Sequence, residues 1–216
     1  MCSLSEQIIY NVHLMNTIEK QDSLTLGILE AIEKNEGLTQ RHLASDLGVA
    51  LGLANSYLKR CAHKGLIKIS QAPANRYLYY LTPKGFTEKG RLTAKFLSSS
   101  LDFYRRASND YYQLILECEN SDYKRIVLCG ISELAEIASL RLNESKREII
   151  AVYSPWPTTD KFLDKPVYSK IEQIPQSDVL LLTEMNRPVE ILEQVKNYYG
   201  DYRSLLIPAF LKSIRE

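Results

Sequence analysis

The chain has 216 residues, of which 45% are hydrophobic and 25% charged, with a formal net charge of +1. This length allows two modest domains. No apolar run approaches the roughly 20 residues needed to span a bilayer, and the N-terminus lacks the cationic and apolar regions of a secretory signal, so we expect a cytoplasmic protein.

Residues 1–23 are expected to form a helical arm. Its apolar residues recur at helical spacing and are Ile8, Ile9, Val12, Met15 and Ile18. The sequence predicts that this arm joins a second apolar helix in a dimer interface.

Residues 24–84 carry the pattern of a winged helix-turn-helix, which is most distinct at residues 38–70. Leu43, Ala44 and Leu47 share one face of a first short helix, and the second helix repeats this with Ala54, Tyr57, Leu58 and Cys61. Thr39 is suited to cap the first helix, and the glycines at 48 and 65 are suited to end the two helices. The sequence therefore predicts two helices packed on one small core.

The outer face of the second helix, residues 51–64, consists of small, amide and cationic side chains. Such groups reach base edges and phosphates in a major groove, although a merely solvated helix face has a similar composition. The predicted DNA-binding residues on this face are Gly52, Asn55, Ser56, Lys59, Arg60 and Lys64. We add three from the start of the first helix, namely Thr39, Gln40 and Arg41.

A two-stranded wing is expected next, with the run Ile67–Ile69 as one strand and Tyr77–Leu81 as the other. The turn-prone segment 71–76 joins them and ends in Arg76. This arginine is predicted to enter a minor groove, where negative potential is concentrated, and the alternative is a solvated loop arginine.

The segments LGVALGLANSYLKRCAHKGLIK and NRYLYYLTPKGFTEKGRLT resemble the MarR-like winged-helix regulators, most closely the subgroup associated with exopolysaccharide and capsule gene clusters. The resemblance spans about residues 24–105. It implies that the N-terminal half of helix 51–64 enters the major groove while the wing touches the flanking backbone. The chain departs from this family at Ala50, where serine is usual, and at Leu53, where a polar residue is common.

Charge divides along the chain in the same way. Residues 24–106 hold 13 Lys and Arg against 6 Asp and Glu, whereas residues 107–216 hold 13 against 17. A basic segment followed by an acidic one suits a protein that meets phosphate with one domain only.

Residues 85–120 contain no proline and are expected to form a helical linker and dimerisation element. Its apolar residues recur at helical spacing and are Leu92, Phe96, Leu97, Leu101, Tyr104, Tyr111, Tyr112, Leu114 and Ile115. A two-fold protein matches palindromic half-sites, which favours a homodimer. The alternative is a connecting helix that packs only on its own domain.

Residues 121–216 alternate apolar runs with helical patterns, which is typical of an α/β fold with a mostly parallel sheet. Five parallel strands are expected, at 125–129, 148–153, 166–168, 178–182 and 204–207, with helices near 131–142 and 189–198.

This half resembles the small CoA-binding-type Rossmann-like domains, because GISELAEIA stands where they read GxGxxA. The resemblance implies a phosphate at the helix N-terminus, beside Gly130, Ile131, Ser132 and Glu133. Tyr153 and Ser154 replace the acidic residue that would bind an adenosine ribose, which argues against NAD as the ligand. The identity of the ligand stays open, with a nucleotide-sugar or a dinucleotide as the candidates. Trp156 is placed either to stack on a ligand or to cover the core edge.

An enzyme is not expected. His13, His42 and His63 lie outside the second half, which offers no catalytic triad and no paired carboxylates. The cysteines at 2, 61, 118 and 129 lack metal-ligand spacing, so we expect neither a metal site nor disulfides.

These patterns together predict a dimeric DNA-binding transcriptional regulator whose second domain senses a phosphate-bearing metabolite. The alternative is a DNA-binding scaffold whose degenerate Rossmann-like domain mediates protein–protein interaction without a ligand.

Overall fold

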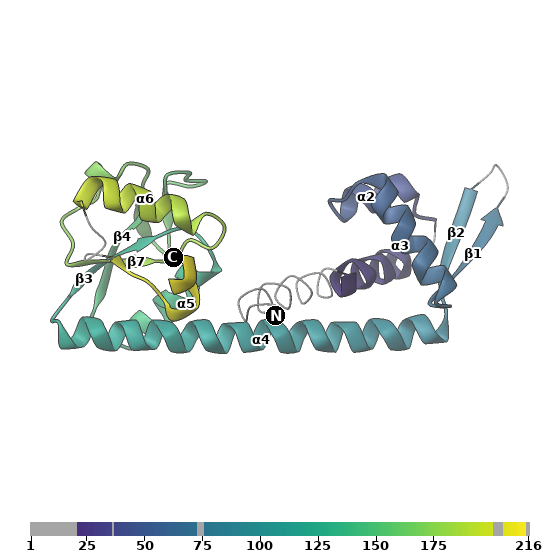
Figure 1. Ribbon diagram of the computed structural model, residues 1–216, viewed down its shortest axis with the longest axis horizontal. Coiled ribbons are helices and arrows are strands. Elements are labelled where there is room, and N and C mark those ends of the chain that lie inside the picture. The colour runs from purple at the N-terminus through teal and green to yellow at the C-terminus, as the bar shows by residue number, and fades with distance from the viewer. Residues whose placement is uncertain (1–20, 36, 73–75, 201–204, 215–216) are drawn as a thin grey trace, which may run out of the picture. The chain divides into compact units, whose positions relative to one another are not determined.

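The computed structural model describes residues 21–35, 37–72, 76–200 and 205–214 (Figure 1). The predicted arm lies outside these residues up to position 20. The chain divides into two compact units, Met1–Ser100 and Leu101–Glu216. Helix α4 (Pro83–Asn120) contributes residues to both units.

Three helices build the core of the first unit: residues 21–34, α2 (Gln40–Asp46) and α3 (Leu51–His63). Ile28 and Leu29 of the first helix are fully buried against Leu43 of α2 and Leu58 of α3. The predicted inward faces of both short helices are thus confirmed. Burying these apolar faces together fixes how α3 presents its opposite face.

The turns around α2 and α3 follow from single residues. The Thr39 hydroxyl accepts a hydrogen bond from the His42 backbone N–H at 3.2 Å and so caps α2, as predicted. Gly48 and Gly65 have φ angles of +61° and +70°, a left-handed conformation that favours glycine. At the start of α3, Ala50 provides no side-chain cap, so this helix end relies on its core packing.

The wing is an antiparallel pair of strands, β1 (Ile67–Ala72) and β2 (Arg76–Leu81), in which Ile69 pairs with Tyr79. Ile67 and Tyr79 are buried, which ties the wing to the helical core. The predicted wing is therefore present, and its tip at residues 73–75 lies outside the described part of the chain.

Residues 82–85 join the wing to α4. The Thr82 hydroxyl donates to the Gly65 carbonyl at 2.7 Å and accepts the Gly85 N–H at 3.0 Å. Pro83 occupies the start of α4, where its missing N–H costs nothing. Helix α4 thus begins two residues before the predicted position 85.

The second unit contains a six-stranded sheet in the order β5–β6–β4–β3–β7–β8. Five of these strands pair in parallel, as predicted. The four parallel pairings are β6 with β4, β4 with β3, β3 with β7, and β7 with β8. The parallel strands are β3 (Arg125–Cys129), β4 (Glu148–Tyr153), β6 (Lys165–Tyr168), β7 (Val179–Leu182) and β8 (Leu205–Leu206).

Strand β5 (Lys161–Phe162) was not predicted from the sequence. It pairs antiparallel with β6 at the sheet edge, and its two residues are too few to give an alternating pattern. The sheet is therefore mixed rather than purely parallel.

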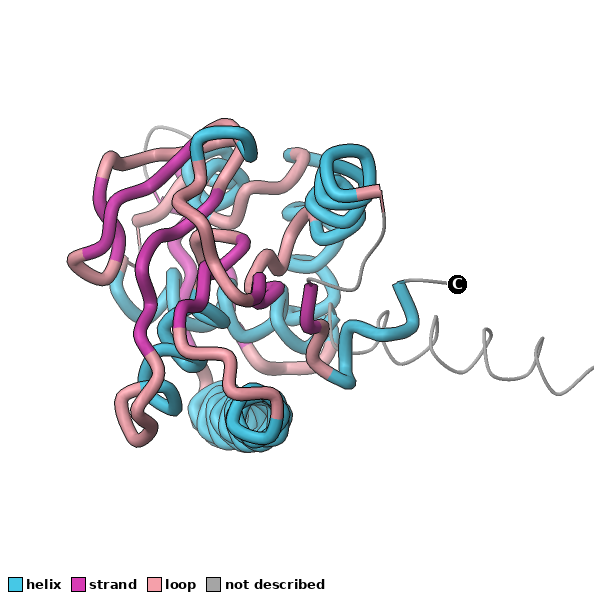
Figure 2. Tube along the Cα trace, turned by 90° about the vertical axis from the view of Figure 1, so that its left-hand side faces the viewer, coloured by secondary structure: helices cyan, strands magenta, loops and turns pink. Residues whose placement is uncertain are grey.

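Helices cover both faces of this sheet (Figure 2). The C-terminal part of α4 and helix α5 (Glu133–Leu142) pack on one face, and α6 (Pro188–Tyr199) packs on the other. Between β6 and β7 stands only a 3-10 turn, η1 (Ile171–Gln173), and a second such turn, η2 (Ala209–Ile214), follows β8.

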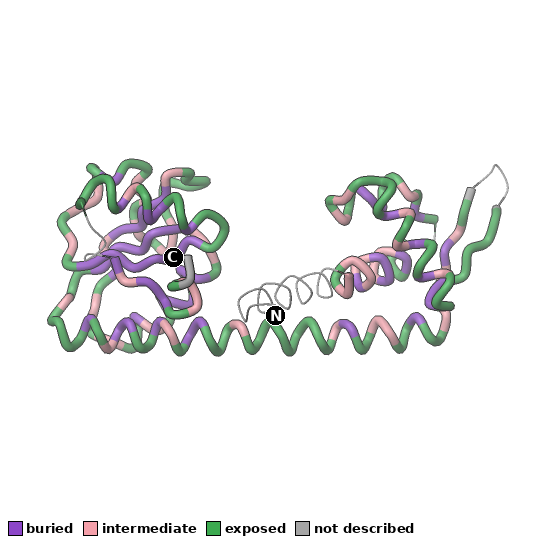
Figure 3. The backbone as a smooth tube through the Cα atoms, in the orientation of Figure 1, coloured by how far each residue is buried: buried purple, intermediate pink, exposed green. Residues whose placement is uncertain are grey.

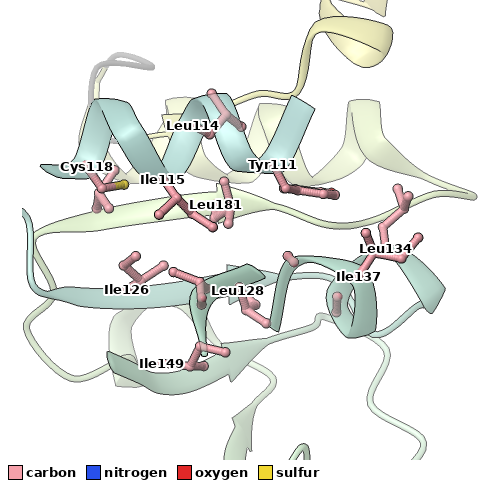
Figure 4. Close-up of a cluster of buried hydrophobic side chains, with 14 of the residues drawn as sticks. Tyr111, Leu114, Ile115, Cys118, Ile126, Leu128, Leu134, Ile137, Ile149 and Leu181 are labelled. Carbon is pink, nitrogen blue, oxygen red and sulfur yellow. The ribbon is translucent and has the colours of Figure 1, made fainter. Parts of the chain in front are cut away.

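The side chains of successive residues in a strand point to opposite faces of the sheet. Ile126 and Leu128 of β3 join the α4 and α5 cluster, whereas Val127 and Cys129 join the α6 cluster. Figure 4 shows Ile115 of α4 beside Leu181 of β7 in the first cluster. The central strands are buried on both faces, as Figure 3 shows, and this explains their continuous apolar runs.

Candidate nucleic-acid interface

The outward face of α3 carries three of the predicted DNA-binding residues in the open. Gly52, Ser56 and Lys59 are all exposed. A Cβ built on Gly52 would meet nothing within 4 Å, so the backbone there is accessible to a close partner. Because these three positions are four and three residues apart, they lie on one face of the helix.

Two apolar side chains accompany them at the start of α3. Leu51 and Leu53 are 43% and 40% exposed, although they are large and hydrophobic. A thymine methyl group in a major groove is the kind of partner that such side chains contact. Leu53 was noted in the sequence only as a departure from the family pattern, and its exposure makes it a candidate contact residue.

Asn55 differs from its neighbours on α3. Its side chain is only partly exposed, and its Oδ1 atom is buried without a hydrogen-bond partner among the described residues. A buried, unsatisfied amide oxygen costs free energy, commonly about 1–3 kcal/mol. Asn55 is thus less free to meet a base than its place in the sequence predicted.

Arg60 and Lys64 lie at the C-terminal end of α3. The Arg60 guanidinium stands 5.6 Å from the centre of the Tyr57 ring and donates to Gln21 Oε1 at 3.3 Å. The Lys64 side chain is exposed, and its backbone carbonyl accepts a hydrogen bond from Lys84 Nζ at 2.8 Å. Both side chains are exposed, but the Arg60 guanidinium has partners within its own unit, whereas the described contacts give the Lys64 ammonium none.

The start of α2 brings one cation to the surface. Arg41 is exposed, but Thr39 is occupied as the helix cap, and Gln40 Nε2 donates to the Tyr79 hydroxyl of the wing at 3.1 Å. Gln40 thus links α2 to β2. The side chains of Thr39 and Gln40 are thus engaged within the unit, whereas the described contacts include none for the Arg41 guanidinium.

The wing adds a cation that sequence reasoning missed. Lys68 is exposed on β1 between Ile67 and Ile69, and the alternation of this strand was the signal that could have identified it. Arg76 begins β2 next to the wing tip, and its side chain is outside the described part of the structure. Its predicted contact with a minor groove therefore stays a prediction.

Acidic groups of the first unit pair mainly with α4. Lys89 bonds Glu33, and Lys95 bonds Asp22 at 2.7 Å. Arg91 donates two hydrogen bonds to Glu88 and holds the pKa of that carboxyl below its usual range. By contrast, no described acidic residue forms an ion pair with the exposed cations at 41, 59, 64 and 68. The α2, α3 and wing surface thus keeps its positive charge.

The three cysteines in the described part of the chain, Cys61, Cys118 and Cys129, are buried. Burial raises the pKa of Cys61 to about 11 and that of Cys118 to about 11, and it raises the pKa of Cys129 further. Thiols with raised pKa values are poor nucleophiles and metal ligands at neutral pH. The described residues contain no group of three or more side chains suited to a metal ion.

In the second unit, the predicted ligand residues surround the carboxyl end of β3. Gly130 has a φ of +121°, and a Cβ there would lie 2.3 Å from the backbone nitrogen of Glu184. Its missing side chain thus makes room for the segment that follows β7. Thr183 Oγ1 donates to the Gly130 carbonyl at 2.8 Å and closes this contact.

Ser132 acts as the N-cap of α5. Its hydroxyl accepts the Leu134 N–H at 3.1 Å and donates to the Thr183 carbonyl. One of the backbone donors that would hold a phosphate is therefore already satisfied by this chain. The neighbouring residues Ile131 and Glu133 are partly exposed and exposed, respectively.

Tyr153 and Ser154, at the end of β4, are buried. The Tyr153 hydroxyl donates to Gln194 Oε1 of α6, and burial raises the pKa of Tyr153 to about 12. Trp156 is 38% exposed, and the Arg187 guanidinium lies 4.7 Å from its ring centre. Of the predicted ligand residues, Glu133 and Trp156 are exposed, and Ile131 and Ser132 are partly exposed.

Comparison with known proteins agrees with this description of the first unit. Residues 21–68 match the family model described as winged helix-turn-helix DNA-binding. The described helices and paired strands between residues 21 and 81 therefore have the arrangement of a winged helix-turn-helix. No curated protein sequence matches the chain.

Several solved structures match part of the chain at low sequence identity. They include MepR of Staphylococcus aureus bound to DNA, at 22% identity over 47% of this chain and 80% of that one, with a TM-score of 0.36. PcaV of Streptomyces coelicolor with its natural ligand has 20% identity over 45% and 74%, with a TM-score of 0.35. ZitR of Lactococcus lactis has 23% identity over 56% and 96%, with a TM-score of 0.34.

None of the helices in the described part of the chain is both long and apolar enough to cross a membrane.

Proposed function

We propose that this protein is a MarR-like transcriptional regulator that binds double-stranded DNA through α3 and the wing. The observation that carries the proposal is the exposed cationic surface centred on Lys59 of α3, whose lysines and arginines form no ion pair with an acidic residue in the described part of the chain. Lysines and arginines there would meet phosphates, while Ser56 and the exposed leucines would face bases.

The test is fluorescence anisotropy of the full chain with its own upstream DNA and with a scrambled duplex, across a salt series. A specific regulator binds the upstream duplex more tightly, and its affinity falls steeply with salt because counterions are released. Equal, weak binding of both duplexes would contradict sequence-specific recognition.

Two matched variants test whether α3 makes the DNA contact. Lys59→Gln should weaken binding to both duplexes and lower the salt slope by about 0.9, the effect of one lost phosphate contact. Lys146→Gln removes the same charge from an exposed position of the second unit and should change neither. If both variants behaved alike, α3 would not be the DNA-binding element.

We further propose that the protein is a dimer that uses α4. Leu92, Tyr111, Leu114 and Ile115, which belonged to the predicted apolar set, are buried within their own units and so are unavailable to a partner. The remaining members are exposed and are Phe96, Leu97, Leu101, Tyr104 and Tyr112. Leu97 and Leu101 lie one turn apart on one face of α4, which supports self-association there.

The second unit is proposed to be a Rossmann-like sensor domain. Its parallel strands follow the order third, second, first, fourth, fifth, which is the order of the doubly wound nucleotide-binding folds. The helix between the second and third of these strands is missing, since only β5 lies between β4 and β6. A metabolite at the β3 edge would meet Ile131, Glu133 and Trp156.

The competing proposal is a scaffold that binds no metabolite. The close approach of Glu184 to Gly130 favours the scaffold. The space that the missing side chain leaves is filled by this chain itself, so the glycine serves folding rather than a ligand. A sensor shows ligand-dependent thermal stabilisation, since a ligand that binds only the folded state raises its stability. A scaffold does not.

The link to polysaccharide genes rests on the sequence resemblance. It predicts that deleting the gene changes transcript levels of neighbouring polysaccharide genes. Unchanged transcripts would remove this part of the proposal.

A further inference from the structure

A concave surface of the C-terminal unit lies between α4 and α5, apart from the β3 edge. It is a hollow of about 310 Å³ lined by Tyr104, Arg105, Ser108, Asn109, Tyr112 and Arg141. Five of these residues come from two turns of α4, and Arg141 reaches over from α5. This volume is at the lower end of the range of small-molecule sites.

The charges that line the hollow have one sign. Arg105 and Arg141 are both cations, and no carboxylate is among the lining residues. The hydroxyls of Tyr104 and Tyr112 and the amide of Asn109 add hydrogen-bond donors. Such a donor-rich surface is complementary to an anion.

Arg141 is held in place by a buried partner. Its Nε donates to Ser108 Oγ at 2.7 Å, and Ser108 is only 2% exposed. Its Nη1 donates to Glu144 at 3.1 Å, on the outer side. The hydrogen bonds among the described residues leave Nη2 of Arg141 without a partner, so this group is oriented and still has a donor to offer.

Arg105 extends from α4 into solvent, and its partner Asp102 is also exposed. Its Nη1 donates to Asp102 at 2.9 Å, one turn earlier, which leaves Nε and Nη2 unpartnered among the described residues. Two guanidinium groups with free donors can bind the oxygens of one phosphate or carboxylate.

The tyrosines flank this pair of arginines. Tyr104 and Tyr112 are 43% and 44% exposed, and they stand one turn before and one turn after Ser108 on α4. Their rings offer apolar faces for a planar group next to the anion-binding centre.

We propose that this hollow binds the anionic group of a small planar phosphomonoester or a similar carboxylate, with Arg105 and Arg141 as the anion-binding residues. The inference rests on the sensor role proposed for the C-terminal unit and adds a ligand site that is distinct from the β3 edge. Because α4 also contains Lys84 and Gly85 of the first unit, a ligand here binds the helix that the two units share.

The experiment uses isothermal titration of the full chain with AMP, with adenosine and with inorganic phosphate. AMP should bind, inorganic phosphate should compete with it, and adenosine, which has the same ring system without the phosphate, should not bind. Arg105→Gln and Arg141→Gln should each weaken AMP binding by about tenfold, as expected for the loss of a charge-assisted hydrogen bond.

The control is Arg106→Gln. Arg106 is exposed on the same helix, one residue from Arg105, and does not line the hollow. Its replacement removes the same charge and should leave AMP binding unchanged. Arg105 is 69% exposed at its side chain, so Arg105→Gln tests the site even if the Arg141 variant is less stable.

Three results would overturn the inference: no binding of AMP, equal binding of AMP and adenosine, or equal affinity of wild type and Arg105→Gln. If the arginine variants changed sedimentation and left AMP binding unchanged, the hollow would serve contact between two copies of the chain. DNA binding is measured separately without AMP, so a failed ligand test leaves the proposed regulator function standing, and the reverse also holds.

Discussion

Replacing Gly85 with alanine is expected to destabilise the first unit. A Cβ at this position would lie 2.0 Å from the Leu66 carbonyl oxygen and 3.3 Å from Leu81 Cδ2. Contacts under 3.0 Å essentially never occur for a Cβ, and the nearest atom belongs to backbone rather than to a flexible side chain. The Leu66 carbonyl therefore has to move by about 1 Å or more, judged from normal van der Waals separations.

The Leu66 carbonyl oxygen is already a hydrogen-bond acceptor. It accepts hydrogen bonds from the Thr82 backbone N–H and from the Thr82 hydroxyl, both at 3.1 Å. Overpacking costs about 1–3 kcal/mol, and each weakened hydrogen bond costs about 0.5–1.5 kcal/mol. Alanine gains about 1 kcal/mol in helix propensity. With one of the two hydrogen bonds weakened, the net expectation is a loss of about 2 kcal/mol in the free energy of unfolding.

Gly90→Ala is the matched control. Gly90 lies in the same helix, and a Cβ there would meet nothing within 4 Å. This variant should gain about 0.5–1 kcal/mol, because alanine restricts the unfolded chain more than glycine does.

Thermal unfolding followed by circular dichroism measures both variants. For a unit of about 100 residues, Gly85→Ala should lower the midpoint by roughly 8–16 °C, while Gly90→Ala should raise it by a few degrees. If Gly85→Ala raised the midpoint as Gly90→Ala does, the close approach of α4 to Leu66 would be refuted.

Three further predictions concern the second unit and α4. Gly130→Ala should lower the unfolding midpoint in urea strongly, because its Cβ would collide with the backbone of Glu184; unchanged stability would mean that the glycine serves a ligand instead. Hydrogen bonds from the Arg125 and Lys124 backbone N–H groups lower the pKa of Asp178 from its ordinary 3.8, so its stabilising effect is complete above that value and is lost as the pH falls. Asp178→Asn should therefore flatten the dependence of the urea midpoint on pH below about pH 4, and an identical profile for both proteins would count against these bonds. Leu101→Glu should shift the protein towards monomer in sedimentation velocity, since it places a charge on the exposed apolar face of α4; an unchanged sedimentation coefficient would place the dimer contact elsewhere.

The sequence by itself determined the secondary structure well, because its signals are local. Strands β3 and β7 are recognisable as apolar runs, since both of their faces are buried. Thr39 and the glycines at 48 and 65 fixed the ends of α2 and α3 through their own side-chain and backbone preferences. The outward face of α3 followed from helical spacing alone.

Only the tertiary structure decided what particular residues of the candidate sites do. Gly130 fits a phosphate-binding pattern in the sequence, but the atoms it accommodates belong to Glu184, more than 50 residues away. Gln40 fits a DNA-contact position, yet it bonds Tyr79 of the wing. A sequence pattern specifies which face a side chain occupies, whereas its partner depends on which distant segment packs against that face.

The hollow between α4 and α5 shows the same limit. Ser108 and Arg141 carry no motif, and nothing in the order of residues brings the two helices together. Their hydrogen bond exists because α4 and α5 bury apolar faces against the same side of one sheet. Burial of those faces is encoded locally, but the juxtaposition of polar groups at their edges is a product of packing.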